Sequence, residues 1–328
     1  CCIMVKNNKR KVHAVSRGSR ALNHRSSIKW VLSSNVPLLL MTLPGIACFI
    51  CFNYLPMGGL VLAFKNFIPR RGIFGSDWIA FKNFEFMFRN PTFWLTVKNT
   101  LLYNGVFLVT NVVFPMSLAL AINEVRSKKL ARVFQTGMIM PHFISYVVVS
   151  VILFAIISAD SGIVGHFYKN RGLMPIAFYS EPKYWPFFLI FIYVWKGTGY
   201  SSIIYLGSIT GISDEYYEAA VIDGATKWQQ IVHITLPFLK PMAVVLTIMR
   251  VGSMFSSNFD LFYQVPMNSG QLYSVTNTID VFVYNTLKES NNVGLSSAVS
   301  FVQSVAGLVL VLVTNQIIRW IDRDLAMF

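Results

Sequence analysis

The sequence holds few groups that could perform covalent chemistry, and none of them lies in a recognised catalytic pattern. H-E-x-x-H and G-x-S-x-G are absent, as is the G-x-x-x-x-G-K-[ST] loop that cradles nucleotide phosphates. Cys48 and Cys51 lie one helical turn apart without a second pair of ligands, so buried thiols are favoured over a metal site. The sequence therefore predicts no catalytic residue, no metal site and no enzyme.

Polar side chains inside long apolar blocks are the other candidates, because such groups usually face a cavity or a partner. They are Asn104, Asn111, Trp195, Tyr200, Arg250, Ser257, Asn258 and Asp260, together with Lys196 and Ser253. Arg250 is expected near the middle of its block, too far from Asp260 along one helix to pair with it. For Arg250, a place on a conduit and a clamp on helix-end carbonyls are both open. For each of the others, packing is the commoner role.

The blocks themselves predict an all-α membrane protein. Charged residues make up 13% of the 328 residues, about half of what a soluble domain carries. Several stretches without Asp, Glu, Lys or Arg exceed the ~20 residues that a helix needs to cross a bilayer. Backbone groups in lipid must be satisfied within the segment, so these blocks are helices. Six transmembrane helices are predicted, near 36–56, 95–122, 133–157, 184–208, 242–262 and 297–318.

Basic residues set the predicted orientation. The first 30 residues contain eight Lys and Arg and no acid, which places the tail 1–35 in the cytoplasm. Counting six spans through the domain 36–320 puts the 209–241 loop and the tail 321–328 on the cytoplasmic side as well. The 57–94 loop, expected outside, carries five basic residues and fits this rule poorly. The net charge of +14 is explained by a basic inner surface facing anionic lipids, without a nucleic-acid partner.

Segment 213–236, within the 209–241 loop, is predicted to form two short helices that meet at a glycine. Ser213 can cap the first helix, Gly224 allows a sharp change of direction, and Thr226 with Gln229 forms a T-x-x-Q capping box for the second helix. Leu236-Pro237 is expected to end the second helix before the fifth span begins at Pro241. On spacing alone, a helix pair lying on the membrane surface and a docking element for another protein are both open.

The same segment resembles the EAA loop of the membrane subunits of ABC importers. Glu218-Ala219-Ala220, Gly224, Ile234 and Leu236-Pro237 meet the spacing of that loop, and Asp223 with Ala225 matches its common D-G-A form. Further blocks at 43–64, 72–88, 119–149, 249–263 and 280–285 look like the polysaccharide-type permeases of the carbohydrate-uptake ABC transporters. Residues 264–272 depart from the pattern of this subgroup.

The resemblance implies a six-helix permease of type I importer architecture in the bacterial inner membrane. The EAA loop would be a coupling helix that docks on a cytoplasmic ATPase. The implied partners are a second, homologous permease, two ATPase subunits that bind ATP and Mg²⁺, an extracellular sugar-binding protein and an oligosaccharide or polysaccharide substrate. No cofactor is expected on this chain. The ATPase-coupling residues so implied are Glu218, Ala219, Ala220, Asp223, Gly224, Ala225, Leu236 and Pro237.

A secondary transporter or channel without an ATPase is the alternative. It predicts buried carboxylates for ion coupling, and the predicted spans hold almost none. For an importer of sugars, the amide, hydroxyl and aromatic groups among the polar candidates suit sugar hydroxyls and ring faces.

Overall fold

A computed structural model describes residues 36–321. The predicted tail 1–35, and all but the first residue of the predicted tail 321–328, lie outside the described residues. The contacts divide the chain into two units that meet at Gly58 and Gly59. The described part of the smaller unit is helical: α2 (Val36–Phe49), a π-helical turn (Ile50–Tyr54) and α3 (Leu55–Met57).

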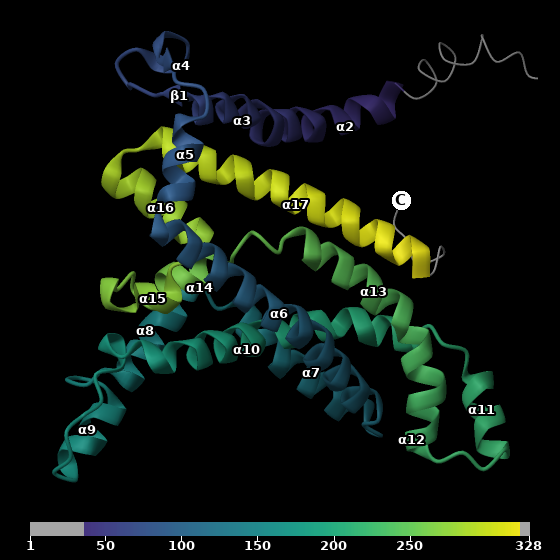
Figure 1. Cartoon of the computed structure of the whole chain (residues 1–328). Coiled ribbons are helices and arrows are strands. Elements are labelled where there is room, and N and C mark those ends of the chain that lie inside the picture. The colour runs from purple at the N-terminus through teal and green to yellow at the C-terminus, as the bar shows by residue number, and fades with distance from the viewer. Residues whose placement is uncertain (1–35, 322–328) are drawn as a thin grey trace, which may run out of the picture. The chain divides into compact units, whose positions relative to one another are not determined.

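The larger unit is built on four long helices (Figure 1): α6 (Pro91–Asn123), α10 (Trp185–Thr210), α13 (Leu236–Gly252) and α17 (Val293–Ile321). Shorter helices connect them: α4 (Gly72–Gly75), α5 (Lys82–Arg89), α7 (Lys128–Phe143), α8 (Tyr146–Ile157), α9 (Ile163–Asn170), α11 (Asp214–Ile222), α12 (Lys227–Gln230), α14 (Phe259–Gln264), α15 (Tyr273–Thr276) and α16 (Ile279–Ser290). Strand β1 (Lys65–Asn66) pairs antiparallel with β2 (Asp77–Trp78).

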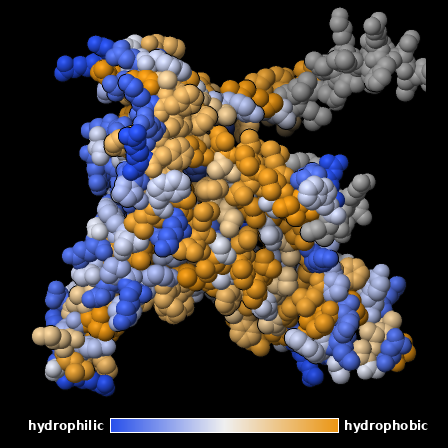
Figure 2. Space-filling model, in the orientation of Figure 1, coloured by the Kyte–Doolittle hydropathy of each residue, from blue (hydrophilic) through white to orange (hydrophobic). Residues whose placement is uncertain are grey.

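The predicted all-α membrane fold is confirmed. Five helices of the described region are long and apolar enough to cross a bilayer, and a sixth span is available if the bent pair α7–α8 counts as one. The five are Leu40–Phe64, Pro91–Asn123, Pro182–Thr210, Lys227–Gly252 and Val293–Trp320. On the larger unit, apolar residues cover the middle of the face drawn in Figure 2, and polar residues gather near α4 and α9.

The third predicted span, 133–157, was wrong as a single helix. α7 and α8 meet at an angle of 94°. Ile144 and Ser145 are extended, and the Ser145 side chain accepts from the amide of Val148 and so starts a new helix. Pro141 lacks an amide donor in the last turn of α7, which weakens that turn before the break.

The fifth predicted span, 242–262, was also wrong at both ends. The helix that begins at Lys227 runs without a stop to Gly252, and residues 253–258 are not helical. Pro237 does not end this helix, because a wider π-helical turn, Ile231–Thr235, precedes it and places it in the first turn of α13.

The main core of the larger unit surrounds α10. Trp185, Leu189 and Ile192 follow one face of this helix, are at most 4% exposed, and share a buried cluster with Phe107 of α6 and Phe262 of α14. The C-terminal half of α10 instead contacts α13 through a smaller cluster around Tyr205. α10 is therefore the central helix on which α6, α7, α13 and α14 converge.

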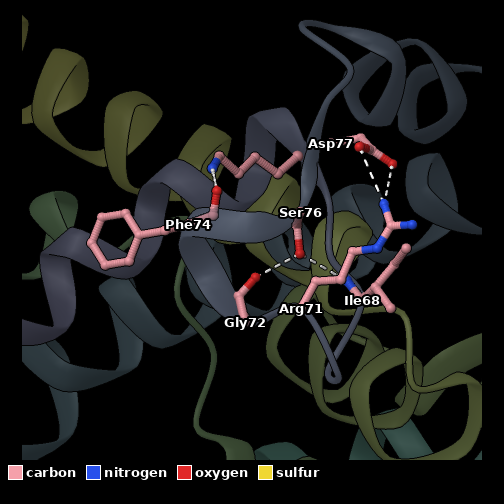
Figure 3. A network of polar contacts seen from close by, with 7 residues as sticks. Ile68, Arg71, Gly72, Phe74, Ser76 and Asp77 are labelled. Atoms are coloured by element: carbon pink, nitrogen blue, oxygen red, sulfur yellow. Dashed lines mark hydrogen bonds and ion pairs between the residues drawn. The ribbon is translucent and has the colours of Figure 1, made fainter.

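The loop before α5 is held by its own polar groups (Figure 3). Ser76 donates to the carbonyl of Gly72 at 2.6 Å and accepts from the amide of Ile68 at 3.0 Å. Lys65 donates to two carbonyls of the same turn, and Arg71 pairs with Asp77 at 3.2 Å. Together with an Arg89–Glu85 pair, these contacts give three of the five basic residues of the 57–94 loop a local partner. These side chains thus hold the loop in its conformation.

Replacing Gly199 by Ala should separate α10 from α7. A methyl group at this position would overlap the carbonyl of Met138, which is backbone and cannot turn away. Overpacking of this kind costs about 1–3 kcal/mol. We expect a lower thermal unfolding midpoint of the purified protein. Gly197→Ala is the matched control, because nothing lies within 4 Å of a methyl group there; equal midpoints for the two variants would contradict the close approach.

Candidate functional site

The predicted two-helix segment exists, and both of its helix starts are confirmed. The Ser213 side chain accepts from the amide of Glu215 at 3.4 Å and caps α11. Thr226 and Gln229 form a reciprocal capping box at the start of α12. Each N-cap stabilises its helix by roughly 1 kcal/mol. The sequence therefore fixes where both helices of the segment begin.

The turn between the helices explains the spacing of the small residues. The amide of Ala225 donates to the carbonyl of Ala220 at 2.8 Å, and the amide of Gly224 donates to that of Val221 at 3.1 Å. These two bonds are those of a Schellman C-cap, which needs a left-handed residue at its corner. Gly224 is that residue, with φ of 78°. Ala220 and Ala225 thus face each other across the turn, where a larger side chain would spread it.

The end of α11 is turned outward. Glu218, Ala219 and Asp223 are exposed, and neither acid forms an ion pair within residues 36–321. Ile222 is 86% exposed and Trp228 71%. Two large apolar side chains and two free carboxylates therefore share the surface of this segment, which we call the tip.

The segment is fastened to the rest of the chain behind the tip. The hydroxyl groups of Tyr217 and Thr235 lie 3.0 Å apart and link α11 to the π-helical turn. Lys227 lies 3.9 Å from Glu124 at the end of α6, an exposed pair that adds little stability. A polar pocket of about 740 Å³ lies next to both contacts and is lined in part by Asn123, Arg126, Asp214 and Tyr217.

Two of the predicted coupling residues lie away from the tip. Leu236 and Pro237 are in the first turn of α13, where Leu236 is partly buried and Pro237 exposed. The structure brings Ala220, Asp223, Gly224 and Ala225 together around a hollow of about 300 Å³ between α11 and α12. The motif thus divides into residues that shape the tip and residues that begin the long helix behind it.

The second group of candidates lies at the break between α13 and α14. Asn104 of α6 donates to the carbonyls of Met254 and Ser256, both at 2.8 Å. Ser257 donates through its hydroxyl to Asp280 of α16 at 2.8 Å, and its amide bonds to the same carboxylate. Non-helical backbone at membrane depth needs such internal partners. Asn104 and Ser257 therefore hold the break open as an ordered turn.

A third group lines a small pocket between α6, α10 and α13. The structure places Arg250 in the last turn of α13, and not near the middle of its block as predicted. Asn111 of α6, Tyr200 of α10 and Arg250 of α13 surround a space of about 130 Å³ together with Thr247. Asn111 donates to the hydroxyl of Tyr193 at 2.7 Å. The Arg250 side chain is exposed, and within the described residues its guanidinium has no hydrogen-bond or ion-pair partner. Arg250 is therefore a cation without a partner in this chain.

The remaining candidates are not brought into this pocket. Asn258 caps α14 and donates to the hydroxyl of Tyr146 at 2.9 Å. Trp195 lines a separate apolar groove of about 800 Å³ between α6, α7 and α10. Asp260 is exposed in α14, on a different helix from Arg250. The single helix assumed for these two residues was wrong because the chain breaks between them.

Sequence reasoning did not predict the structural roles of two residues, Asp280 at the α13–α14 break and Lys196 at the α7–α8 break. Asp280 accepts from Ser257 and, through its second oxygen, from Gln303 of α17 at 3.0 Å. Lys196 of α10 was named only as a possible pathway residue, yet it is 5% exposed and donates to backbone carbonyls of the α7–α8 break. The only sequence signal was an isolated charge in an otherwise apolar stretch.

Residues 111–327 match the sequence profile of the family described as binding-protein-dependent transport system inner membrane component. The chain belongs to this family. The permease is 32% identical to Protein LplB of Bacillus subtilis over 310 residues, which cover 94% of this chain and 97% of the relative. It is 35% identical to the polygalacturonan/rhamnogalacturonan transport system permease protein YteP of the same organism, over 86% of this chain and 87% of the relative.

Solved structures agree with the fold of the permease. It matches a chain in the crystal structure of a bacterial ABC transporter involved in the import of the acidic polysaccharide alginate, with a TM-score of 0.80 and 33% identity over 90% of this chain and 99% of that one. A second structure, with an alginate pentasaccharide-bound periplasmic protein, matches with a TM-score of 0.79 and 32% identity over 90% and 98%. The predicted type I permease architecture of a carbohydrate-uptake ABC transporter is therefore confirmed.

Gly224→Ala should loosen the corner of the permease's two-helix segment. The φ of 78° would place an alanine in the left-handed region, at a cost of roughly 1–2 kcal/mol, although the added methyl group meets no atom within 4 Å. We expect faster hydrogen exchange of the amides of Gly224 and Ala225 than in the parent protein. Gly207→Ala in α10 adds a methyl group in equally open space at an ordinary φ; the same exchange change in this control would argue against backbone strain.

Proposed function

We propose that the permease forms half of the path through which an ATP-driven importer takes up an oligosaccharide or a fragment of an acidic polysaccharide. The tip of segment 213–236 would receive the motion of a cytoplasmic ATPase. The observation that carries this proposal is the tip itself, where Ile222 and Trp228 are exposed outside the apolar middle of the spans beside two unpaired acids.

The position of the tip supports a protein partner over lipid. Exposed apolar side chains along α17, such as Leu308, lie within a span that lipid or another membrane subunit can cover. Ile222 lies in α11, which is outside the candidate spans, and Glu218 and Asp223 beside it carry charge. A clustered apolar surface edged by charge typically marks a protein interaction site.

The proposal includes the partners that this mechanism needs. They are a second, homologous permease, two ATPase subunits that hold ATP and Mg²⁺, and an extracellular sugar-binding protein. Both termini of the chain, and the tip, would lie in the cytoplasm of a bacterial cell. One of the similar solved structures contains a periplasmic protein carrying an alginate pentasaccharide, which supports the binding-protein partner.

Transport would proceed by alternating access. Closure of the ATPases on ATP would move the tip, and the helices behind it would turn a central cavity from one side of the membrane to the other. A ligand shifts such an equilibrium only as far as it binds the two states differently. The substrate path would therefore need groups that contact substrate in one state more than in the other.

Arg250 is the proposed contact for a substrate carboxylate. It has no partner within the described chain and shares its pocket with the hydrogen-bonding groups of Asn111 and Tyr200. Two of the similar proteins carry names of acidic polymers, polygalacturonan and alginate. A guanidinium matches a carboxylate with two parallel hydrogen bonds, which suits it to such a substrate.

Ile222→Asp should weaken docking of the ATPase without unfolding the permease. The side chain is 86% exposed, so little packing inside the chain is lost, while an apolar anchor in an interface is worth at least about 1 kcal/mol, or roughly fivefold in affinity. We expect less ATPase to co-purify and ATP-dependent uptake to fall in proteoliposomes. Met174→Asp is the control, because Met174 is 92% exposed outside this segment. Unchanged co-purification and uptake in Ile222→Asp would remove Ile222 from the docking surface, whereas intact uptake by a parent protein that co-purifies with no ATPase would support a transporter that needs none.

Arg250→Met should lower uptake of a uronic-acid oligosaccharide by roughly tenfold, because hydrogen bonds to charged groups are worth about 1.5–3 kcal/mol. Uptake of a neutral oligosaccharide of equal length should change less. Arg250→Lys keeps the charge and should recover part of the loss. The measurement is ATP-dependent uptake in proteoliposomes, with assembly of the complex checked in parallel. Normal uptake of both sugars by a normally assembled Arg250→Met complex would remove Arg250 from the path.

A further inference from the structure

The break between α7 and α8 creates a physical problem within the bilayer. The last carbonyl groups of a helix have no amide partner in their own helix, and no water is available at membrane depth. Here the chain turns by 94° at Ile144 and Ser145. The Ser145 hydroxyl accepts from an amide of α8, and the amide of Ile144 donates to the carbonyl of Pro141 at 3.3 Å. Donors are still needed at the carbonyls of His142 and Ile144.

Lys196 of α10 satisfies those carbonyls. Its ammonium donates to the carbonyl of Pro141 at 3.0 Å, to that of His142 at 3.3 Å and to that of Ile144. An ammonium has three N–H donors, so these bonds use all of them. The ring of Tyr146 lies 4.7 Å from the same nitrogen and offers its π face to the cation.

The charge of Lys196 is balanced by dipoles and not by an acid. Within the described residues its ammonium forms no ion pair. The C-terminus of α7 carries the negative end of a helix dipole, which favours a cation at this place. A cation so buried is costly unless its environment compensates for it, so this position is suited to a lysine and poorly suited to an apolar residue.

The same face of α10 fastens the last turn of α7 at two further points. Gly199, three residues after Lys196, lets the carbonyl of Met138 approach α10 closely. Tyr200, four residues after Lys196, stacks on His142 with ring centres 4.3 Å apart and planes within 9°. Positions spaced by three and four lie side by side on a helix. Three contacts in one row therefore join α10 to the bend.

The bend is also connected to the second break in the membrane. The hydroxyl of Tyr146, the first residue of α8, accepts from Asn258 at 2.9 Å. Asn258 in turn accepts from the amide of Leu261 and begins α14. The order Lys196, Tyr146, Asn258 thus leads from α10 through the first break to the second.

We propose that Lys196 is a positioning residue that makes α10, the α7–α8 bend and α14 move as one rigid body. This inference rests on the proposed function, because α10 ends at Thr210, only four residues before α11 begins at Asp214 and the tip receives its motion. A displacement of the tip would move α8, on the opposite side of the larger unit, by the same amount as α10, because the bend between α7 and α8 would not flex. Without the ammonium, α8 would swing relative to α10 and ATP hydrolysis would no longer drive transport.

The test follows the distance between α8 and α10 in the assembled complex. Spin labels are placed at Val151→Cys and Phe187→Cys, which are 57% and 71% exposed, in a protein whose native cysteines are replaced. With Lys196 present, we expect one narrow distance that is the same without nucleotide and with ATP when hydrolysis is blocked. With Lys196→Met we expect a broad distance that differs between the states, uptake reduced roughly tenfold, and ATP hydrolysis retained.

The controls separate positioning from folding. Lys196→Arg keeps a cation with several donors and should restore the narrow distance and part of the uptake. If Lys196 only filled space, Met would serve equally well at this position. A distance that changes with nucleotide in the Lys196 protein, or a narrow distance with full uptake in Lys196→Met, would overturn the proposal. Failure of the Lys196 protein to bind an ATPase would refute the proposed function, while Lys196→Met should still broaden the distance in the ATPase-free chain.

A second variant applies if Lys196→Met does not reach the membrane. Tyr146→Phe leaves all three ammonium–carbonyl bonds in place and removes only the link to Asn258. We expect the label distance from Val151 to Phe187 to stay narrow, and the distance from Val151 to a label at Met267, which is 46% exposed, to become state-dependent. A Val151–Met267 distance that remains constant, with normal uptake, would overturn the link between the two breaks.

Discussion

In a membrane protein, backbone groups left free where a helix bends or ends need partners within the protein, and here they find them on other helices. One candidate span is bent at the α7–α8 junction, and the helix Lys227–Gly252 ends at the non-helical residues 253–258. Lys196 donates to carbonyls of the α7–α8 bend, and Asn104 donates to carbonyls of residues 253–258. Asp280 accepts from the amide and the hydroxyl of Ser257 in the same segment. These polar groups therefore have a structural role, since they bond to the backbone at the two breaks. A polar group without such a structural role is a candidate for contact with a substrate or another subunit. Arg250, whose guanidinium has no partner within the described residues, is the clearest such group.

The same reasoning separates the apolar surfaces of the molecule. Exposed leucines and valines on α17 follow a span, where lipid or a second membrane subunit can cover them. The apolar residues of the tip have no such cover, because α11 is short and carries acids. Basic residues of the 57–94 loop differ again, since Lys65, Arg71 and Arg89 have local acceptors. The surroundings of an exposed or charged group, more than its residue type, thus decide how its exposure is interpreted.

Local signals in the sequence predicted local features well. The caps at Ser213 and Thr226, the corner at Gly224 and the six apolar blocks all depend on residues within one or two turns of each other. The two breaks were not predicted. Local signals are present, in Pro141 and Ser145 at the first break and in the polar run 256–258 at the second, but the partners that hold the backbone there lie far along the chain. The donor for the carbonyl of Pro141 is 55 residues away, and Asn104 is 150 residues from Met254. The prediction that the helix ends at Pro237 failed for a related reason, since the π-helical turn that accommodates this proline has no simple sequence signature.

Segment 213–236 and the two breaks form a closed loop of contacts. α10 leads from α11 to the first break through Lys196, and α12–α13 leads from the same segment directly to the second break. Tyr146 and Asn258 join the breaks to each other and close the loop. Bending at any one place would have to stretch a contact elsewhere in it, so the frame resists internal deformation and favours motion as a unit. α17 is attached differently, since Gly252 and Gly307 bring its backbone against α13 without a polar contact between those residues. Gln303 of α17 also donates to Ser256 and Asp280 beside the second break. α17 is therefore joined to this frame by polar contacts at that end and by small residues along α13.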